Sequence, residues 1–360
     1  MYNRTFKILL LLLFFAITVY SQDTTKSLSF SGYAEAYYLY NLNRPINNNQ
    51  PSFIYNFNRQ NEVNLNLGFA KVSYNQDKVR ANLAFMTGTY AQANLAGEPD
   101  VFRNVFEANI GAKLSKTKNM WLDLGIFPSH IGFESAIGKD NYNLTRSLLA
   151  ENSPYYEAAA KVSYTTKSEK LFLSAMLLNG WQRIRRPDGN TTPAFGTQVT
   201  YKPTGKVTFN SSTFIGNDKP DTARQMRYFH NFYGTYQIAA KWALITGFDI
   251  GAEQKTKGSA DYNLWYSPVL IARYTPTTKH SISVRAEYYQ DKHGVIIPTE
   301  LPNGIQAFGF SANFDYAIQK ELLWRIEART LRSENKLFQT RNSTLSSITN
   351  FITTSFAFSF

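Results

Sequence analysis

Hydrophobic and polar residues alternate with a period of two along much of the chain. In residues 281–289, isoleucine, valine, alanine and tyrosine occupy every second position, and serine, arginine and glutamate lie between them. Segments 307–316 and 322–330 repeat the pattern. A period of two places successive side chains on opposite faces of a β-strand, so it predicts strands with one apolar and one polar face. The same spacing assigns to one apolar face Val63, Leu65, Leu67 and Phe69.

The connections between these segments alternate between short turns and longer polar loops. This order is typical of hairpins whose turns all lie on one side of a membrane and whose loops all lie on the other. We therefore predict that residues 22–360 form a single all-β domain, a closed antiparallel transmembrane β-barrel of about sixteen strands with short periplasmic turns and long extracellular loops. The predicted strands are 28–40, 61–74, 79–91, 101–114, 120–129, 156–165, 170–181, 194–202, 206–216, 226–238, 241–254, 263–275, 280–290, 305–317, 321–332 and 346–360.

The start of the chain predicts export. Arg4 and Lys7 precede an apolar run of about 13 residues, which is too short to span a bilayer as a helix. Small residues stand at the positions that a signal peptidase recognises before Gln22. Residues 1–21 are therefore predicted to be a cleaved signal peptide.

The end of the chain predicts how the sheet closes. In the last segment, FITTSFAFSF, Phe356, Phe358 and Phe360 occupy alternate positions. An open sheet edge in lipid leaves backbone groups unpaired at a cost of several kcal/mol each, so the last strand is expected to pair with the first. We predict that the three phenylalanines face lipid. A terminal aromatic residue after alternating apolar residues also resembles the signal that the barrel-insertion machinery reads, which makes that machinery an expected partner.

Composition and charge narrow the class of protein. The chain has no cysteine, which excludes disulfides, thiolate metal sites and lipid anchoring through cysteine. Its formal net charge is +12, but the lysines and arginines are scattered, so no nucleic-acid partner is predicted. Aromatic residues make up 15% of the chain while its mean hydropathy is −0.33, which fits a wall between lipid and water.

Four stretches of the sequence resemble a known family. They are FSGYAEAYYLYN, LGIFPSHIGFESAIGKDNYNLTRSLLAENSPYYEAAAKVSY, LLNGWQRI and the aromatic end. Through these stretches the sequence is similar to the OmpL-like β-barrel porins of the bacterial outer membrane. The resemblance runs over nearly the whole mature chain. The resemblance implies an outer-membrane location and a general or weakly selective pore. None of the stretches is a catalytic signature.

The longest loop, residues 130–155, is the candidate for a constriction. Sixteen strands leave a lumen wide enough for water, and in trimeric general porins the corresponding loop folds inward. The same analogy makes a homotrimer possible. We expect Asn143 to cap a short helix that passes through Leu148 and that Ser153-Pro154 ends. The alternative for the segment as a whole is an ordinary solvated loop. The residues assigned to the constriction are His130, Glu134, Lys139, Asp140, Arg146 and Glu151.

Charged residues on the polar faces of the strands are assigned to the pore wall, because a charge facing lipid costs roughly 2 to 4 kcal/mol near the middle of the bilayer. Arg325, Glu327 and Arg329 beside Arg285 and Glu287 suggest a ladder across the lumen. Structural ion pairs are the alternative to ion guidance. The excess of positive charge favours a weak anion preference. The assigned wall residues are Arg80, Arg103, Glu107, Asp123, Glu157, Lys161, Arg285, Glu287, Asp315, Arg325, Glu327 and Arg329.

The sequence predicts no enzyme, no metal site and no cofactor, because it lacks the HExxH, GxSxG, glycine-rich phosphate-loop and EF-hand patterns. Four histidines are the only bases that titrate near neutral pH: His130, His230, His280 and His293. One catalytic alternative is a barrel phospholipase that pairs a strand histidine, such as His230, with a serine on the outer face.

The predicted function is passive diffusion of small hydrophilic solutes or ions through a water-filled barrel. Two other classes share parts of the pattern. An outer-membrane adhesin or structural barrel would use the same wall without conducting. A secreted soluble β-protein that binds carbohydrate would use its aromatic residues as ligand platforms.

Overall fold

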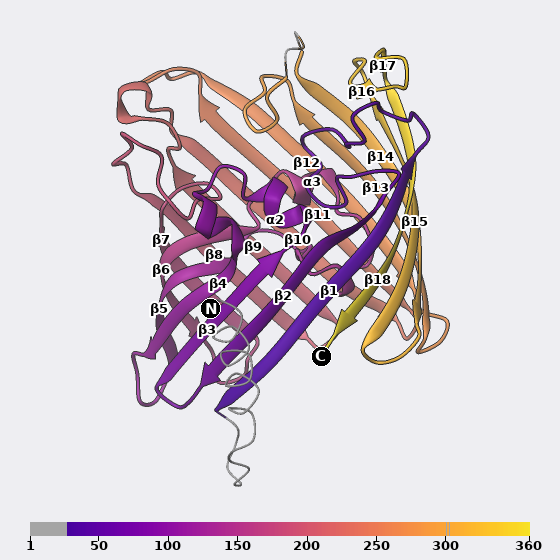
Figure 1. Cartoon of the computed structure of the whole chain (residues 1–360). Coiled ribbons are helices and arrows are strands. Elements are labelled where there is room, and N and C mark those ends of the chain that lie inside the picture. The colour runs from indigo at the N-terminus through magenta and orange to yellow at the C-terminus, as the bar shows by residue number, and fades with distance from the viewer. Residues whose placement is uncertain (1–26, 300, 302) are drawn as a thin grey trace, which may run out of the picture.

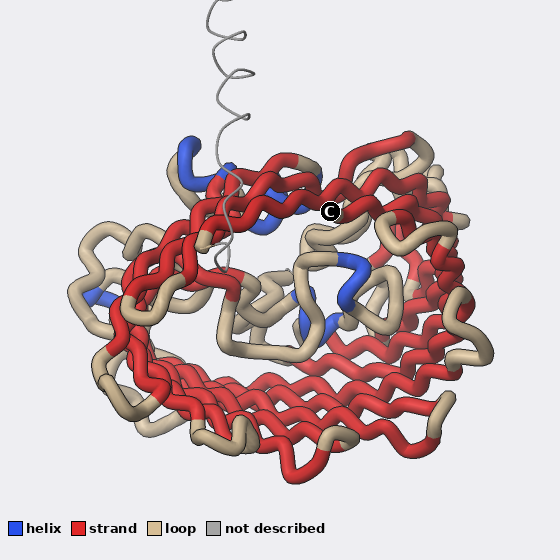
Figure 2. Tube along the Cα trace, turned by 90° about the horizontal axis from the view of Figure 1, so that it is seen from below, coloured by secondary structure: helices blue, strands red, loops and turns tan. Residues whose placement is uncertain are grey.

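The computed structural model describes residues 27–299, 301 and 303–360, so the predicted signal peptide lies outside the described residues. One closed antiparallel barrel is formed by strands in the order β1-β18-β15-β14-β13-β12-β11-β10-β9-β8-β7-β6-β5-β4-β3-β2 (Figures 1 and 2). The prediction of a closed barrel of about sixteen strands is confirmed.

The strands begin and end within four residues of the predicted positions. They are β1 (Leu28–Asn41), β2 (Val63–Asn75), β3 (Val79–Thr87), β4 (Val105–Lys113), β5 (Asn119–Pro128), β6 (Tyr156–Thr165), β7 (Leu171–Leu178), β8 (Ala194–Thr204), β9 (Val207–Gly216), β10 (Arg227–Ala239), β11 (Trp242–Gln254), β12 (Tyr262–Tyr274), β13 (His280–Asp291), β14 (Ile305–Ala317), β15 (Leu322–Ser333) and β18 (Ile348–Ser359). A small separate sheet pairs β16 (Phe338–Gln339) with β17 (Leu345–Ser346).

The first and last strands close the barrel, as predicted. β1 and β18 pair from Tyr33 opposite Ser359 to Asn41 opposite Phe351. The pairing extends to the last residue, because Gly32 and Phe360 exchange two backbone hydrogen bonds of 3.2 Å. Phe356, Phe358 and Phe360 lie on the outer face with exposed fractions of 51%, 45% and 70%. Their outward orientation confirms the predicted apolar face, and recognition by the insertion machinery stays a prediction.

The alternation of faces holds along most strands but is interrupted in β2. A bulge places Leu67 opposite Glu35 and Leu65 opposite Ala36, so Asn66 is the extra residue. An extra residue reverses the side on which the following side chains lie. Leu67 and Phe69 therefore face the interior, and the prediction that they share one outer face with Val63 and Leu65 was wrong.

Short helices occupy the loops rather than the wall: α2 (Thr89–Asn94), η1 (Asp100–Asn104), η2 (Gly138–Asp140), α3 (Leu148–Glu151) and η3 (Asp221–Ala223). β3 ends four residues before its predicted end, because Gly88 takes φ 124° and leaves the strand direction. A Cβ on Gly88 would lie 2.4 Å from the Asn66 carbonyl oxygen, so only glycine allows this close approach. No helix within the described ranges is long and apolar enough to cross a membrane.

The interior of the barrel is partly filled by the long loops. Figure 2 shows loop and helical segments inside the ring of strands. Buried side chains from two loops, such as Phe57 and Leu148, pack against inward-facing strand residues that include Tyr37 and Trp265. The hydrophobic core therefore lies inside the barrel, between loops and wall, and not between two sheets.

We predict that Gly32→Leu weakens barrel closure. A Cβ on Gly32 would lie 2.4 Å from the Phe360 ring, so the larger side chain must displace the last residue, at a cost of roughly 1 to 3 kcal/mol. Ala34→Leu is the matched control, because Ala34 also faces outward on β1 and is exposed. Urea unfolding in lipid vesicles should give a lower unfolding free energy for Gly32→Leu alone. Equal values for both variants would contradict the contact.

Candidate functional site

The loop at residues 129–155, here called the inner loop, crosses the lumen and contacts the opposite wall. Asn143 donates a 3.1 Å hydrogen bond to Ser311, and the Leu144 amide donates one of 3.1 Å to Asn313. Arg325 donates to the Gly138 carbonyl oxygen at 2.6 Å. The inner loop leaves β5, whereas these partners lie on β14 and β15, nearly half the strand order away. The loop is therefore fixed inside the barrel and is not an ordinary solvated loop.

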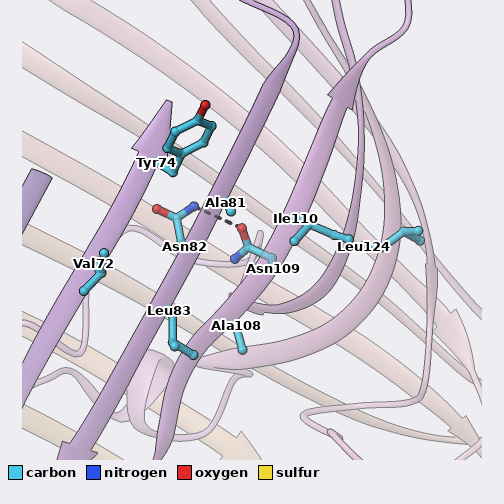
Figure 3. A pocket seen from close by; sticks show the side chains of 9 residues that line it. All are labelled: Val72, Tyr74, Ala81, Asn82, Leu83, Ala108, Asn109, Ile110 and Leu124. Atoms are coloured by element: carbon cyan, nitrogen blue, oxygen red, sulfur yellow. Dashed lines mark hydrogen bonds between the residues drawn. The ribbon is translucent and has the colours of Figure 1, made fainter. Parts of the chain in front are cut away.

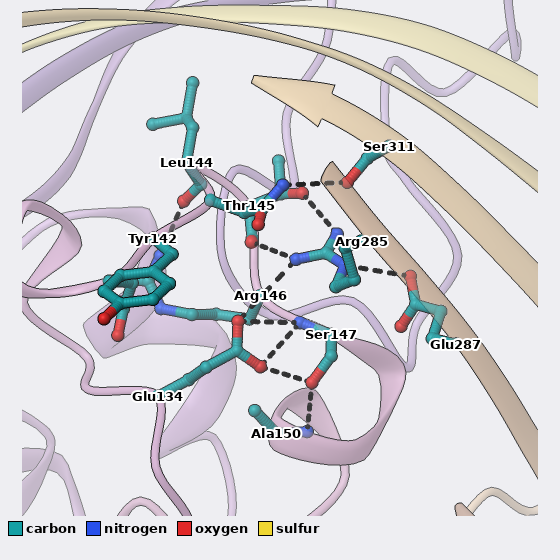
Figure 4. A network of polar contacts seen from close by, with 12 residues as sticks. Glu134, Tyr142, Leu144, Thr145, Arg146, Ser147, Ala150, Arg285, Glu287 and Ser311 are labelled. Carbon is teal, nitrogen blue, oxygen red and sulfur yellow. Dashed lines mark hydrogen bonds and ion pairs between the residues drawn. The ribbon is translucent and has the colours of Figure 1, made fainter. Parts of the chain in front are cut away.

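Hydrogen bonds within the inner loop hold its shape (Figure 4). The Arg146 guanidinium donates to the carbonyl oxygens of Leu144 and Ser135, both at 2.6 Å. Ser147 caps α3 by accepting from the Ala150 amide, and its own amide donates to Glu134 at 3.1 Å. The predicted helix is present at Leu148 and ends before Ser153, but its predicted cap was wrong, because Asn143 bonds the wall and the helix begins after Ser147.

A group of charged side chains on β13, β14 and β15, the wall network, receives the inner loop. The Thr145 carbonyl oxygen accepts from Arg285 at 2.6 Å (Figure 4). The Thr145 amide donates to Glu327 at 2.6 Å, so Thr145 bonds both charged residues. The Leu148 amide donates to Glu287 at 2.5 Å. The members of the wall network are Arg285, Glu287, Asp315, Arg325, Glu327 and Arg329.

The wall network runs along the wall. Arg329 on β15 reaches Glu287 on β13 at 2.7 Å, although β14 lies between these strands. The bridge is possible because the intervening β14 residues are small: a Cβ on Gly309 would lie 2.5 Å from the Glu287 carboxylate. The predicted ladder across the lumen was wrong. The charged side chains of β13 and β15 instead pair along the same part of the wall, over Gly309 of β14.

Burial divides the predicted site residues into two groups. All six members of the wall network are buried, as are four of the predicted constriction residues: His130, Glu134, Arg146 and Glu151. Lys139 and Asp140 are the exceptions, because both side chains are exposed and they pair with each other at 2.9 Å. The buried charges of the wall network therefore hold the inner loop in place.

On β2 to β5, two ion pairs face the lumen and are partly exposed, unlike the buried wall network. Lys71 pairs with Glu107 at 2.5 Å, and their side chains are 26% and 9% exposed. Arg80 pairs with Asp123 at 2.5 Å, with 33% and 3% exposed. In each pair the cation is the more exposed partner, so the surface offered to a solute is positive.

Lys71 borders an internal cavity of about 560 Å³, the turn-side cavity. It is bounded by the inner loop and by strand residues that include Lys71, Ser73, Glu107 and Tyr233. Lys71 and Ser73 lie in the half of β2 that leads to the short turn after Asn75. The cavity therefore extends from the inner loop towards the end of the barrel that carries the short turns.

Three other predicted wall residues have separate positions. Lys161 faces the interior with its ammonium group 4.1 Å from the centre of the Phe127 ring. Glu157 accepts from His130 Nδ1 at 2.6 Å and so ties the start of the inner loop to β6. Arg103 does not lie on the wall, and its prediction was wrong: it lies in η1 and donates to the Glu98 carbonyl oxygen at 2.9 Å, because β4 begins only at Val105.

Glu35 is a buried partner of the inner loop that the sequence did not identify. It accepts from Asn66 at 3.2 Å and from Ser355 at 3.3 Å. A Cβ on Gly138 would come within 2.5 Å of both Glu35 carboxylate oxygens, so the loop packs directly on this carboxylate. Its inward position between Tyr33 and Tyr37 was the available signal, because a carboxylate among aromatic residues requires partners.

Burial raises the pKa of two carboxyl groups of the inner loop. The pKa of Glu151 is about 7, because burial outweighs the hydrogen bonds from the Tyr55 and Asn56 amides and the nearby charge of Arg146. Burial likewise raises the pKa of Glu134 despite Arg285. Burial by itself would lower the pKa of His130, but Glu157 raises it above its ordinary value.

The outer face carries one polar pair of catalytic interest. Ser211 on β9 and His230 on β10 approach to 2.8 Å between Oγ and Nε2. Acyl transfer also needs a group that orients the histidine and donors for the oxyanion. Within the described residues His230 Nδ1 has no hydrogen-bond partner, and the register pairs both residues with neighbouring strands, which uses the backbone amides. The geometry supports a structural role, in which Ser211 and His230 form a hydrogen bond with each other within an apolar surface.

A shallow groove also lies on the outer face, over Ala81 and Ala108 (Figure 3). Its rim consists of outward apolar side chains such as Leu83, Ile110 and Leu124, whereas Asn82 and Asn109 bond to each other at 3.0 Å. The groove faces the apolar surroundings and lies outside any path through the lumen. Over the described ranges, no group of three or more histidine and acidic side chains is placed to hold a metal ion.

A closed sixteen-stranded barrel with an apolar exterior, a charged interior and an inward loop defines an outer-membrane porin. The family model described as "Putative beta-barrel porin-2, OmpL-like" matches residues 27–360, and the chain belongs to this family. The resemblance seen in the sequence is confirmed, as is the outer-membrane location. The short turns are accordingly periplasmic and the long loops extracellular.

Solved porins share the fold at low sequence identity. The anion-selective porin from Comamonas acidovorans has a TM-score of 0.60 at 8% identity, covering 93% of this chain and 99% of its own. The outer-membrane channel DcaP of Acinetobacter baumannii has 0.57 at 9%, covering 95% and 100%. Salmonella typhi OmpF has 0.59 at 10%, covering 92% and 97%. The comparison with curated proteins finds no match.

We predict that Glu327→Ala releases the inner loop. The substitution removes the acceptor of the Thr145 amide and one of the carboxylates that pair with Arg285, and removing one partner of a buried ion pair costs about 3 to 5 kcal/mol. Urea unfolding in lipid should show the loss, and added protease should cleave within residues 129–155. Glu321→Ala, in the exposed turn before β15, is the control and should behave as the unaltered protein.

We also predict that the folded protein loses stability as the pH rises through about 7. Glu151 keeps its proton in the folded state up to about pH 7 but releases it near 4.5 when unfolded, so its contribution is complete below 4.5 and is lost as pH rises through 7. The raised pKa values of Glu134 and His130 act in the same direction.

Glu151→Gln should therefore reduce the fall in melting temperature between pH 5 and pH 8, measured in detergent, and Asp140→Asn should not. Asp140 is a suitable control because it lies exposed on the same loop. An unaltered pH profile in Glu151→Gln would show that this carboxyl group does not titrate in the range.

Proposed function

We propose that this protein is a diffusion porin that passes small hydrophilic solutes and prefers anions. The observation that carries the proposal is the unequal exposure of the charged pairs in the lumen. Lys71 and Arg80 remain accessible, while Glu107 and Asp123 are covered. Arg273 repeats the arrangement, since its side chain is 28% exposed and that of Asp315 is 4% exposed.

A second cavity, the loop-side cavity, lies above the inner loop. It has a volume of about 350 Å³ and is bounded by extracellular loop residues such as Trp181 and Arg183. Tyr156 borders both cavities. We infer that a solute enters through the loop-side cavity, passes Tyr156, which borders both cavities, and leaves through the turn-side cavity. The solute then meets the exposed cations after it has passed Tyr156.

The low-identity relatives support the proposal only through their fold. The solved structure described as an anion-selective porin shows that such a barrel accommodates anion transport. A homotrimer is part of the proposal, because one solved structure of OmpT from Vibrio cholerae is described as a trimer form. Native mass spectrometry of the detergent-solubilised protein measures this directly, and a monomer alone would remove the trimer from the proposal.

The main alternative is an outer-membrane adhesin or structural barrel without a conducting pore. It predicts no single-channel steps in a planar bilayer, whereas a porin gives discrete conductance. The secreted soluble β-protein is excluded by the closed barrel and by the family to which the chain belongs.

We predict that Lys71→Glu combined with Arg80→Glu shifts the reversal potential in a potassium chloride gradient towards cation preference. The two substitutions replace accessible positive charges with negative ones in the lumen. Lys118→Glu is the control, because this exposed residue lies in a periplasmic turn where salt at 0.1 M screens charges beyond about 10 Å. A conducting double variant with unaltered preference would refute the role of the two cations.

Charge substitution is a sharper test than removing the inner loop. Deletion of the loop would expose the wall network, whose buried side chains make hydrogen bonds to Gly138, Thr145 and Leu148. A change of conductance would then reflect both a wider lumen and newly exposed charges. Lys71 and Arg80 make no ion pair with the inner loop, so their substitution leaves the contacts that hold the inner loop unchanged.

A further inference from the structure

The loop-side cavity holds an arginine whose charge is unpaired. In the described part of the chain, no hydrogen bond or ion pair joins the Arg183 guanidinium to another residue, and its Nε is buried without a partner. The nearby Arg227 differs, because it pairs with Glu253 at 2.6 Å and with Asp218 at 3.1 Å. A partly buried guanidinium without an acceptor is costly unless a ligand supplies one.

The backbone that carries Arg183 is held on both sides. The Ile184 and Arg185 amides donate to the buried Glu98 carboxylate at 2.8 and 3.1 Å. On the other side, the Trp181 amide donates to Asp218 at 2.8 Å. The backbone that carries Arg183 is therefore fixed, so binding has only the side chain left to order.

The surroundings of Arg183 define the shape of a ligand. Gly97 leaves room for the guanidinium, since a Cβ there would lie 3.1 Å from Arg183 Nη1. The rings of Trp181 and Tyr156 border the same cavity, with Val295 and Ile296 as further apolar residues. At about 350 Å³ the cavity lies at the small end of the range for ligand sites.

Among the residues that the structure describes, the charges around the cavity leave one cation for a ligand. Arg227 and Lys219 also border the cavity, but Arg227 is paired with Asp218 and Glu253, and Lys219 is paired with Glu253, so Arg183 is the cation that a ligand can neutralise. A single carboxylate can take both hydrogen bonds of the guanidinium edge. Aromatic and aliphatic side chains beside that edge favour an apolar or planar body on the same molecule.

We propose that the loop-side cavity binds small organic monocarboxylates with an aromatic or apolar body, with the carboxylate on Arg183 and the body against Trp181 and Tyr156. The inference deepens the proposed function, on which it rests, by naming the solute class of the same path. Binding at the extracellular entrance raises the local concentration of the solute before it passes Tyr156.

Calorimetric titration of the detergent-solubilised protein with benzoate, acetate and phosphate tests the site without requiring conduction. Benzoate is expected to bind at least tenfold more tightly than acetate and more tightly than phosphate. Arg183→Gln is expected to weaken benzoate binding at least tenfold. Arg183→Lys is expected to give an intermediate loss, because lysine keeps the charge but cannot donate the two parallel hydrogen bonds of a guanidinium.

Arg185→Gln is the matched control, because Arg185 lies on the same loop, is 60% exposed at its side chain and pairs with Asp188. It should bind benzoate as the unaltered protein does. Equal affinity for benzoate and acetate, tighter binding of phosphate, or unaltered binding in Arg183→Gln would each overturn the proposal.

Bilayer recordings separate this outcome from the fate of the proposed function. Benzoate on the extracellular side should reduce the chloride current of the unaltered protein and of Arg185→Gln, but not that of Arg183→Gln. Chloride conductance without benzoate binding would overturn the monocarboxylate site and leave the porin intact. Benzoate binding without any conductance would overturn the porin function and leave the site.

Discussion

The structure depends on the requirement that every backbone polar group within the apolar exterior finds a partner inside the protein. Lipid supplies no hydrogen bonds, so the sheet has no edge and the chain pairs its first strand with its last. Closure then fixes the two faces of every strand. Apolar side chains face outward, and polar and charged side chains face the lumen. There they are either hydrated or paired with other protein groups.

The lumen does both, in two separate regions. On β13 to β15 the inner loop covers the charges, and Thr145 supplies peptide groups that match Arg285 and Glu327. Such a buried network contributes little net stability over an apolar core, but it accepts only one arrangement of the loop. On β2 to β5 the charges stay beside open space, and Lys71 and Arg80 remain accessible. The ionic groups that fix the inner loop are therefore different from the accessible cations to which the proposed function assigns the attraction of a solute.

The barrel could be predicted from the sequence because its signals are local. Period-two alternation and the order of short and long connections depend only on neighbouring residues, and the bulge at Asn66 reverses the faces within β2 without removing the strand. The site depends on contacts between distant residues, which have no local signal. The strand register must be known before Gly309 can be seen to leave room for the ion pair between β13 and β15. The path of the inner loop must be known before Gly138 can be placed against Glu35. Charges were therefore assigned correctly to the interior, with Arg103 as the exception, but their exposure could not be inferred.

The division between buried and accessible charges also determines where selectivity can arise. A charge acts on a passing solute only when it is close to the path and not neutralised by a neighbour. The wall network fails both conditions, because the inner loop covers it and its carboxylates match its arginines. Tyr156, which borders both cavities and donates to Glu98 at 3.1 Å, is uncharged and held in place. In the proposed path, discrimination by size falls beside Tyr156 and discrimination by charge falls in the two cavities, so the two act at different points along it.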